Sequence, residues 1–192
     1  MNRIRTELDV LNNMIKDSAK VNIESKSSSS KASVTLIESQ CSTSKVVISG
    51  LPLDSIVIKV DAFKSPDTIF TEINSQCKRS DYIIVADQNG KKNILYIEIK
   101  TTKGPEKDII NQLKGSVCFV GYCKEIAKEF WHKKDFLSEF KPRFVSIYHT
   151  GSRSINKQPT QIKKKTKIND IPERMMKLSY PYKPQFNQLV GA

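Results

Sequence analysis

Residues 78–101 read KRSDYIIVADQNGKKNILYIEIKT, and this stretch decides the expected fold. The apolar run after Asp81 and the run that ends at Lys100 are both typical of strands, because they are rich in β-branched and aromatic residues. Between them lies Asn89-Gly90, the strongest short signal for a two-residue hairpin turn. The stretch therefore predicts two antiparallel strands that pair about this turn.

The hairpin register brings charged residues together inside an apolar strand. With residues 89 and 90 at the turn, Asp81 falls directly opposite Glu98 on the neighbouring strand. Charges among so many apolar residues are costly unless they are paired or bind a metal. Two facing carboxylates are tolerable around a divalent cation, and Mg²⁺ takes one or two carboxylates together with waters and phosphate oxygens. Alternation predicts two faces for the second strand, one with Ile94, Tyr96, Glu98 and Lys100 and the other with Leu95, Ile97 and Ile99.

The same residues carry a resemblance to a known family. Asp81 followed by Glu98-x-Lys100 resembles the D…(D/E)-x-K signature of the PD-(D/E)XK nuclease superfamily, and Ser80 stands where that family often has proline. An Asp strand, a short turn, a (D/E)-x-K strand and then a helix is also the family's order. The resemblance covers roughly residues 55–150. It implies an α/β (α+β) fold of the restriction-endonuclease-like kind, with a mixed β-sheet flanked by helices, and Mg²⁺ or Mn²⁺ as the cofactor.

The resemblance also implies a role for each motif residue. Asp81 and Glu98 would hold the metal, and Lys100 would support the attacking water or offset charge in the transition state. The family often places a glutamine on the following helix, and the segment IINQLKGS supplies Gln112 there. This segment is similar to the Q-x-x-x-Y motif of the RecB-like branch, but Ser116 stands where tyrosine would be.

The resemblance also implies a further carboxylate on an earlier helix or strand, which the family usually has. Asp61 is the preferred metal ligand, because it closes the apolar stretch SIVIKVD. Glu7 is the second choice and Glu38 the third. For each of them a solvated charge with no ligand is the alternative.

The charge balance favours a polyanionic partner. The chain of 192 residues carries 32 Lys and Arg against 20 Asp and Glu, a net charge of +12. Residues 151–192 hold nine basic and two acidic residues, which gives that segment +7. Nucleic acid, and DNA in particular, is therefore the expected partner, although a solvated lysine run explains residues 163–167 equally well. The expected nucleic-acid contacts are Lys78, Arg79, Lys103, Lys163, Lys164 and Lys165.

The rest of the chain suggests an organisation in three parts. We expect an N-terminal helix with a Ser-rich linker over residues 1–32, a PD-(D/E)XK-like core over 33–150 and a basic extension over 151–192. Apolar periodicity predicts helix at 3–20, 106–130 (as one helix or two) and 136–140, a polar linker at 25–33, and strands at 33–39, 45–50, 55–61 and 141–150. Prolines at 181 and 184 argue against helix and predict an extended, partner-docking or disordered tail over 180–186.

Cysteine, histidine and hydropathy patterns exclude several classes of site. The four cysteines have no C-x-x-C spacing and only two histidines exist, which argues against a zinc or His-rich centre. Cys118 and Cys123 lie in an apolar run and are expected to be buried thiols. No stretch has the length of a signal peptide's apolar region or of a membrane span. We therefore expect a soluble, cytoplasmic protein without a membrane partner.

The sequence is compatible with three hypotheses on function. The first is a metal-dependent nuclease acting on DNA in restriction, repair or defence, which as a homodimer or within a larger complex could cut both strands. The second is a non-catalytic nucleic-acid-binding or assembly subunit of the same fold. The third is a protein-interaction subunit whose tail folds on a partner.

Overall fold

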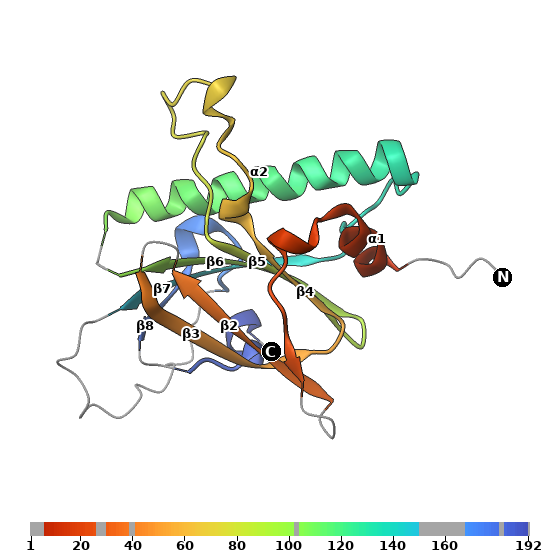
Figure 1. Cartoon of the computed structure of the whole chain (residues 1–192), viewed down its shortest axis with the longest axis horizontal. Coiled ribbons are helices and arrows are strands. Elements are labelled where there is room, and N and C mark those ends of the chain that lie inside the picture. Colours follow the sequence, from red (N-terminus) through yellow and green to blue (C-terminus); the bar gives the residue numbers. More distant parts are fainter. Residues whose placement is uncertain are drawn as a thin grey trace.

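The computed structural model describes residues 6–25, 30–38, 41–101, 104–149, 168–180 and 183–191, with only the backbone of 41–44, 149 and 180. Two β-sheets and one long helix dominate it (Figure 1). Short 3-10 turns η1 to η4 span Asp17–Ala19, Val60–Ala62, Pro66–Thr68 and Pro172–Arg174. The helices are α1 (Glu7–Met14), α2 (Glu106–Trp131) and α3 (Phe186–Val190). The strands are β1 (Glu24–Ser25), β2 (Lys31–Glu38), β3 (Cys41–Pro52), β4 (Ser55–Lys59), β5 (Tyr82–Gln88), β6 (Lys91–Lys100), β7 (Lys141–His149) and β8 (Met176–Tyr180).

The large sheet is mixed and has the strand order β4-β5-β6-β7-β8. Strands β4, β5 and β6 pair antiparallel, whereas β6, β7 and β8 pair parallel. Parallel neighbours need a long crossover connection, and α2 supplies it between β6 and β7. The expected mixed α/β character of the fold is therefore present.

The hairpin has the predicted register. Asn89 and Gly90 both have positive φ, 52° and 84°, as a type I′ turn requires. Gln88 pairs with Lys91, and the ladder continues in the same register to the pair of Tyr82 with Ile97. The next positions along the two strands are Asp81 and Glu98.

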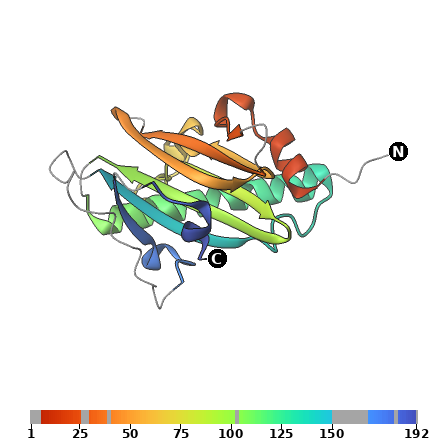
Figure 2. The same cartoon turned by 90° about the horizontal axis from the view of Figure 1, so that it is seen from below.

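The large sheet is covered on both faces, which explains its nearly continuous apolar strands. A second, antiparallel sheet of β1, β2 and β3 lies against one face, with α3 beside it (Figures 1 and 2). Helices α1 and α2 cover the other face. The alternation predicted for β6 is confirmed by this division. The core facing the small sheet takes Leu95, Ile97 and Ile99, and the core facing the helices takes Ile94 and Tyr96.

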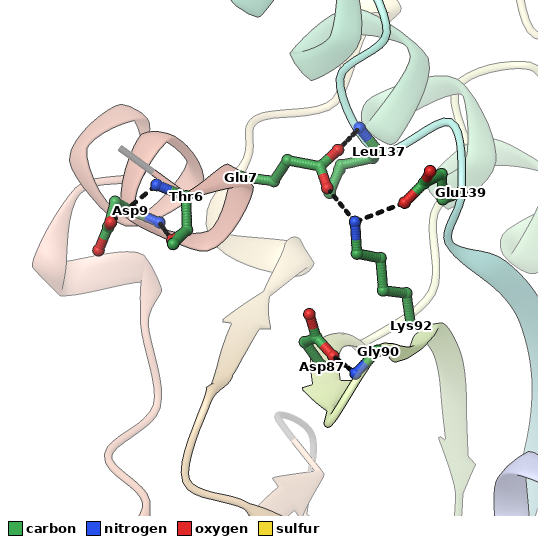
Figure 3. A network of polar contacts seen from close by, with 8 residues as sticks. All are labelled: Thr6, Glu7, Asp9, Asp87, Gly90, Lys92, Leu137 and Glu139. Atoms are coloured by element: carbon green, nitrogen blue, oxygen red, sulfur yellow. Dashed lines mark hydrogen bonds and ion pairs between the residues drawn. The ribbon is translucent and has the colours of Figure 1, made fainter. Parts of the chain in front are cut away.

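An ion-pair network fastens α1 to the far end of the hairpin (Figure 3). Lys92 Nζ lies 2.9 Å from Glu7 Oε2 and 2.6 Å from Glu139 Oε2. Glu7 Oε1 accepts a hydrogen bond of 2.7 Å from the backbone N–H of Leu137. Glu7 is thus paired with Lys92. Lys92 is six residues from Glu98 on β6, which is about 20 Å at the usual rise per strand residue. Glu7 is not a candidate metal ligand.

Several expected element boundaries differ from the structure. The helix predicted over 3–20 ends at Met14, and the linker predicted over 25–33 gives way to β2 at Lys31. The segment 106–130 forms a single helix in spite of its two glycines. Residues 136–140 form no helix, because Leu137 has a positive φ and packs in an irregular turn.

The end of the chain contributes to the core, which corrects the expectation of a separate tail over 180–186. Tyr180 ends β8 and Gln185 is extended, as expected, but Phe186 is helical. After the turn η4, β8 adds a parallel strand beside β7. Phe186 begins α3 and is 1% exposed, and Leu189 and Val190 are also buried. The two prolines precede α3 and do not interrupt it, which is why they did not prevent this short helix. Residues 168–191 are thus packed parts of the fold wherever they are described.

The contribution of α3 can be measured with matched phenylalanine variants. Phe186→Ala should lower the free energy of unfolding by about 3–5 kcal/mol, because it opens a cavity in the core between the sheets. Phe130→Ala, at a position 76% exposed, should change it by less than about 0.5 kcal/mol. Urea denaturation of both variants is the measurement. Equal stability of Phe186→Ala and wild type would contradict the placement of α3.

Candidate active site

Asp81 and Glu98 meet where the hairpin strands leave the ladder. Asp81 Oδ2 accepts a hydrogen bond of 2.7 Å from the N–H of Ile99, and Glu98 Oε2 accepts one of 3.2 Å from the N–H of Asp81. Each carboxylate is thus fixed by the backbone of the opposite strand. The register inferred from the Asn89-Gly90 turn has brought the two predicted acids together.

Lys100 completes the cluster from the same face of β6. Its Nζ lies 2.6 Å from Glu98 Oε1. Glu98 is fully buried, whereas the Lys100 side chain is 30% exposed. Lys100 therefore stands between Glu98 and solvent.

Burial and neighbouring charges shift the pKa values of all three groups. Burial and then the charge of Asp81 raise the pKa of Glu98 to about 8. Burial also raises the pKa of Asp81 to about 6, although the hydrogen bond from Ile99 opposes the shift. Burial disfavours the charged form of Lys100, but the carboxylates, Glu98 first, outweigh it and raise its pKa. Two acids that are reluctant to ionise side by side would gain from a bound cation.

A cavity of about 590 Å³ opens beside this cluster. Four acidic and three basic side chains line it among the described residues, so its wall carries charges of both signs. The charged lining residues are Glu38, Asp61, Asp81, Asp108, Lys78, Arg79 and Lys100. Glu98 is not in the lining but lies behind Lys100 and Asp81.

The expected third carboxylate, Asp61, does reach the cavity. It lies in η2 directly after β4 and is half-buried, with its Oδ2 3.7 Å from Lys59 Nζ. Its negative charge contributes to the raised pKa of Asp81. Glu38, at the end of β2 in the other sheet, also lines the cavity and is 6% exposed. The sequence offered little to place Glu38 there, because its position depends on how the two sheets pack.

Gln112 lines the cavity from α2. Its Oε1 is buried and finds no hydrogen-bond donor among the described residues. A buried amide oxygen without a partner is unfavourable, and it commonly marks a place for water or a ligand. Asp108, one helical turn earlier, lines the same cavity and was not anticipated from the sequence. The i, i+4 spacing to Gln112 was the signal that could have revealed it.

The basic rim is present in part. Lys78 Nζ lies 2.9 Å from Asp108 Oδ1, and Arg79 Nε donates to the carbonyl of Val60 at 3.2 Å. Both side chains line the cavity. The other proposed contacts, Lys103, Lys163, Lys164 and Lys165, lie outside the described residues.

A buried serine pair docks α2 against the strand that carries Asp81. Ser116 Oγ accepts a hydrogen bond of 2.8 Å from the N–H of Ser80, and the two hydroxyl oxygens are 2.7 Å apart. Both serines are fully buried. At Gly115, a Cβ atom would lie 1.6 Å from the carbonyl oxygen of Lys78, so only glycine permits this approach. The contact fixes the helix turn that follows Gln112.

The facing carboxylates of Asp81 and Glu98 could take a divalent cation, within limits set by the structure. The described residues contain no group of three or more His, Cys, Asp or Glu side chains arranged to hold a metal ion. Mg²⁺ needs only one or two protein carboxylates when waters and phosphate oxygens complete its shell. Asp81 and Glu98 fit that requirement, with Asp61 within reach of the same cavity.

The burial of the cysteines and the hydropathy of the helices can also be compared with the expectations from the sequence. Cys123 is buried as expected, but Cys118 is exposed, which corrects the expectation of two buried thiols. Among the described residues, none of the helices combines the length and apolar character needed to cross a bilayer.

Comparison with protein-family models, with curated proteins and with solved structures finds no match.

The buried carboxylates predict an inverse dependence of stability on pH. Because their folded pKa values exceed the ordinary 3.8 and 4.5, the folded protein binds more protons than the unfolded chain between about pH 4 and pH 8. Binding of these protons stabilises the folded protein. This contribution to the free energy of unfolding is complete below about pH 4 and is lost as the pH rises to about 8. Urea denaturation in EDTA should show an unfolding free energy lower at pH 8 than at pH 5 by on the order of a few kcal/mol.

The matched variants for this measurement are Glu98→Gln and Glu125→Gln. The first should remove most of the decline, because the amide does not ionise. The second changes an exposed residue of α2 and should retain it. An undiminished decline in Glu98→Gln would mean that another group titrates.

The two glycines of α2 give a second matched pair. Gly115→Ala should destabilise the protein by more than about 2 kcal/mol, because its methyl group meets the backbone of Lys78. Gly121→Ala meets nothing within 4 Å and should stabilise by up to about 1 kcal/mol through helix propensity. Thermal or urea unfolding measures both, and a stabilising Gly115→Ala would disprove the close contact of the helix.

Proposed function

We propose that this chain is a metal-dependent nuclease of the PD-(D/E)XK, restriction-endonuclease-like type that hydrolyses phosphodiester bonds in DNA. One observation carries the proposal: Asp81 and Glu98 face each other, with Lys100 beside them, at the wall of a cavity that has both acidic and basic lining. The order of antiparallel β4, β5 and β6, then α2, then parallel β7 agrees with the resemblance of the motif.

The protein groups divide the work by their position. Asp81 and Glu98, with Asp61 nearby, would hold Mg²⁺ or Mn²⁺, which supplies a water of lowered pKa and charge to offset that of the phosphate. The unpartnered Oε1 of Gln112 is an acceptor that can orient the attacking water. Arg79 and Lys78 stand at the rim, where they can bind the phosphate backbone.

Lys100 has two tasks in this proposal. Without a cation its ammonium neutralises Glu98 at 2.6 Å and so stabilises the buried acid. A bound cation would neutralise Glu98 in its place and would leave Lys100 available to the cavity that it already lines. There Lys100 could position the water or offset the charge that develops on the phosphate.

A non-catalytic nucleic-acid-binding subunit is the second candidate. The observation in its favour is that Glu98 is completely buried and already paired with Lys100. Such a pair is self-sufficient, and a protein of this fold could retain the basic rim without cutting. The two candidates differ in whether a divalent cation is used.

Cleavage assays separate them. Wild type, Lys100→Ala and the control Lys141→Ala, an exposed residue at the start of β7, are incubated with supercoiled plasmid, single-stranded DNA and RNA. We expect nicking or cutting by wild type and the control with Mg²⁺ or Mn²⁺ and none in EDTA. Lys100→Ala should be slower by about 100-fold or more.

Two other results would each be decisive. Cleavage that is unaffected by Lys100→Ala would place the active site elsewhere. No cleavage of any substrate by wild type, together with salt-sensitive binding of DNA, would support the non-catalytic subunit.

A further inference from the structure

The chain between β4 and β5 forms a projection that we call the arm (residues 61–80). It rises past α2 and away from the sheets, and appears yellow in Figure 1. Its foot is held in place: the ring of Phe63 lies 5.4 Å from that of Phe119 on α2, and Ser65 Oγ donates to the carbonyl of Cys77 at 3.3 Å. Cys77 itself is buried. The arm is therefore an ordered feature with a fixed attachment.

The outer part of the arm exposes large apolar side chains. Ile69 is 81% exposed, Phe70 56% and Ile73 84%, all within five residues of chain. Isolated exposed apolar residues are common, but a projecting cluster of this kind marks an interaction surface. We call these three side chains the arm tip.

The arm is joined to the candidate active site at both ends. It begins at Asp61 and is followed directly by Asp81, both of which line the cavity. Lys78 and Arg79, at its returning end, line the same cavity. The arm tip, by contrast, is flanked by Asp67 and Glu72, so it is not suited to phosphate. Lys78 and Arg79 at the foot offer basic groups to the phosphates of a nucleic-acid strand, and the tip offers apolar surface to its bases.

We propose that the arm tip contacts the bases of the nucleic acid whose backbone lies at the cavity, and thereby favours single-stranded DNA or junctions between duplex and single strand. This inference rests on the proposed function. Apolar and aromatic side chains stack on unpaired bases or enter between base steps that are easily opened. In a closed duplex the faces of the bases are stacked on each other, and exposing them costs the free energy of unstacking. The substrate class would then be DNA with unpaired bases next to the scissile phosphate.

Binding measured without cleavage tests the inference. Oligonucleotides with 2-aminopurine at single positions are titrated with protein in EDTA, as single strands, junctions and full duplexes. Wild type should change the 2-aminopurine fluorescence at a few positions of the single strand and the junction. The double variant Phe70→Ala with Ile73→Ala should abolish this change and weaken binding of both substrates about tenfold or more. Its affinity for the full duplex should stay within about twofold of wild type.

Two controls keep the test specific. Phe130→Ala removes an exposed aromatic side chain from the distal end of α2 and should behave as wild type. We expect the melting temperature of the arm-tip variant to equal that of wild type, because the altered side chains are exposed. This result would exclude unfolding as the cause of weaker binding.

The outcomes distinguish this inference from the proposed function. If the arm-tip variant gives the same fluorescence changes and the same affinities as wild type, the inference is overturned, even if the protein cleaves DNA. A wild-type dimer that the arm-tip variant turns into a monomer, with DNA affinity unchanged, would overturn it in favour of a second copy of the chain as the occupant. Failure of the nuclease proposal would instead appear as absent cleavage with the 2-aminopurine response retained.

Discussion

The burial of the Glu98 carboxylate is the constraint on which the account depends. A carboxylate with no exposed surface in the middle of a sheet needs compensation, and the structure provides it from two sides. The N–H of Asp81 donates to one oxygen, and the ammonium of Lys100 neutralises the other. Yet Asp81 also places a second acid beside it, which raises the pKa of Glu98 further. Groups with pKa values shifted in this way by burial and by a neighbouring charge occur often at functional sites, and the proposal of a metal-binding site starts from this observation.

The second requirement is that α2 lies close to this acid pair. Gly115 and Ser116 allow the helix to touch the backbone before β5, and the same serine pairs with Ser80. These two serines are also the positions at which the motif differs from the PD-(D/E)XK pattern that it resembles. They meet in space and form one buried hydrogen-bonded contact. This contact fixes the helix that carries Gln112.

The sequence was sufficient where local chemistry determines geometry. The Asn89-Gly90 turn and the two-residue period of β6 determined the register, and with it the meeting of Asp81, Glu98 and Lys100. A long amphipathic pattern was likewise enough to predict α2.

The sequence was insufficient where tertiary packing decides. Prolines near residue 180 suggested an extended tail, because nothing local reveals that Phe186 has a pocket between the two sheets. The presence of Glu38 beside the cavity depends on how the sheets pack against each other, and that of Asp108 on how α2 lies over the large sheet. Lys163, Lys164 and Lys165 remain an expectation from charge alone.

Crystals grown near pH 8 with Mn²⁺ test the central claim most directly, because anomalous scattering locates the metal independently of activity. The account predicts an anomalous peak bound by Asp81 and Glu98, with the ammonium of Lys100 moved from Glu98 into the cavity. A cavity without a peak, with the contact between Lys100 and Glu98 intact at saturating Mn²⁺, would contradict it and leave the acid pair as a purely structural feature.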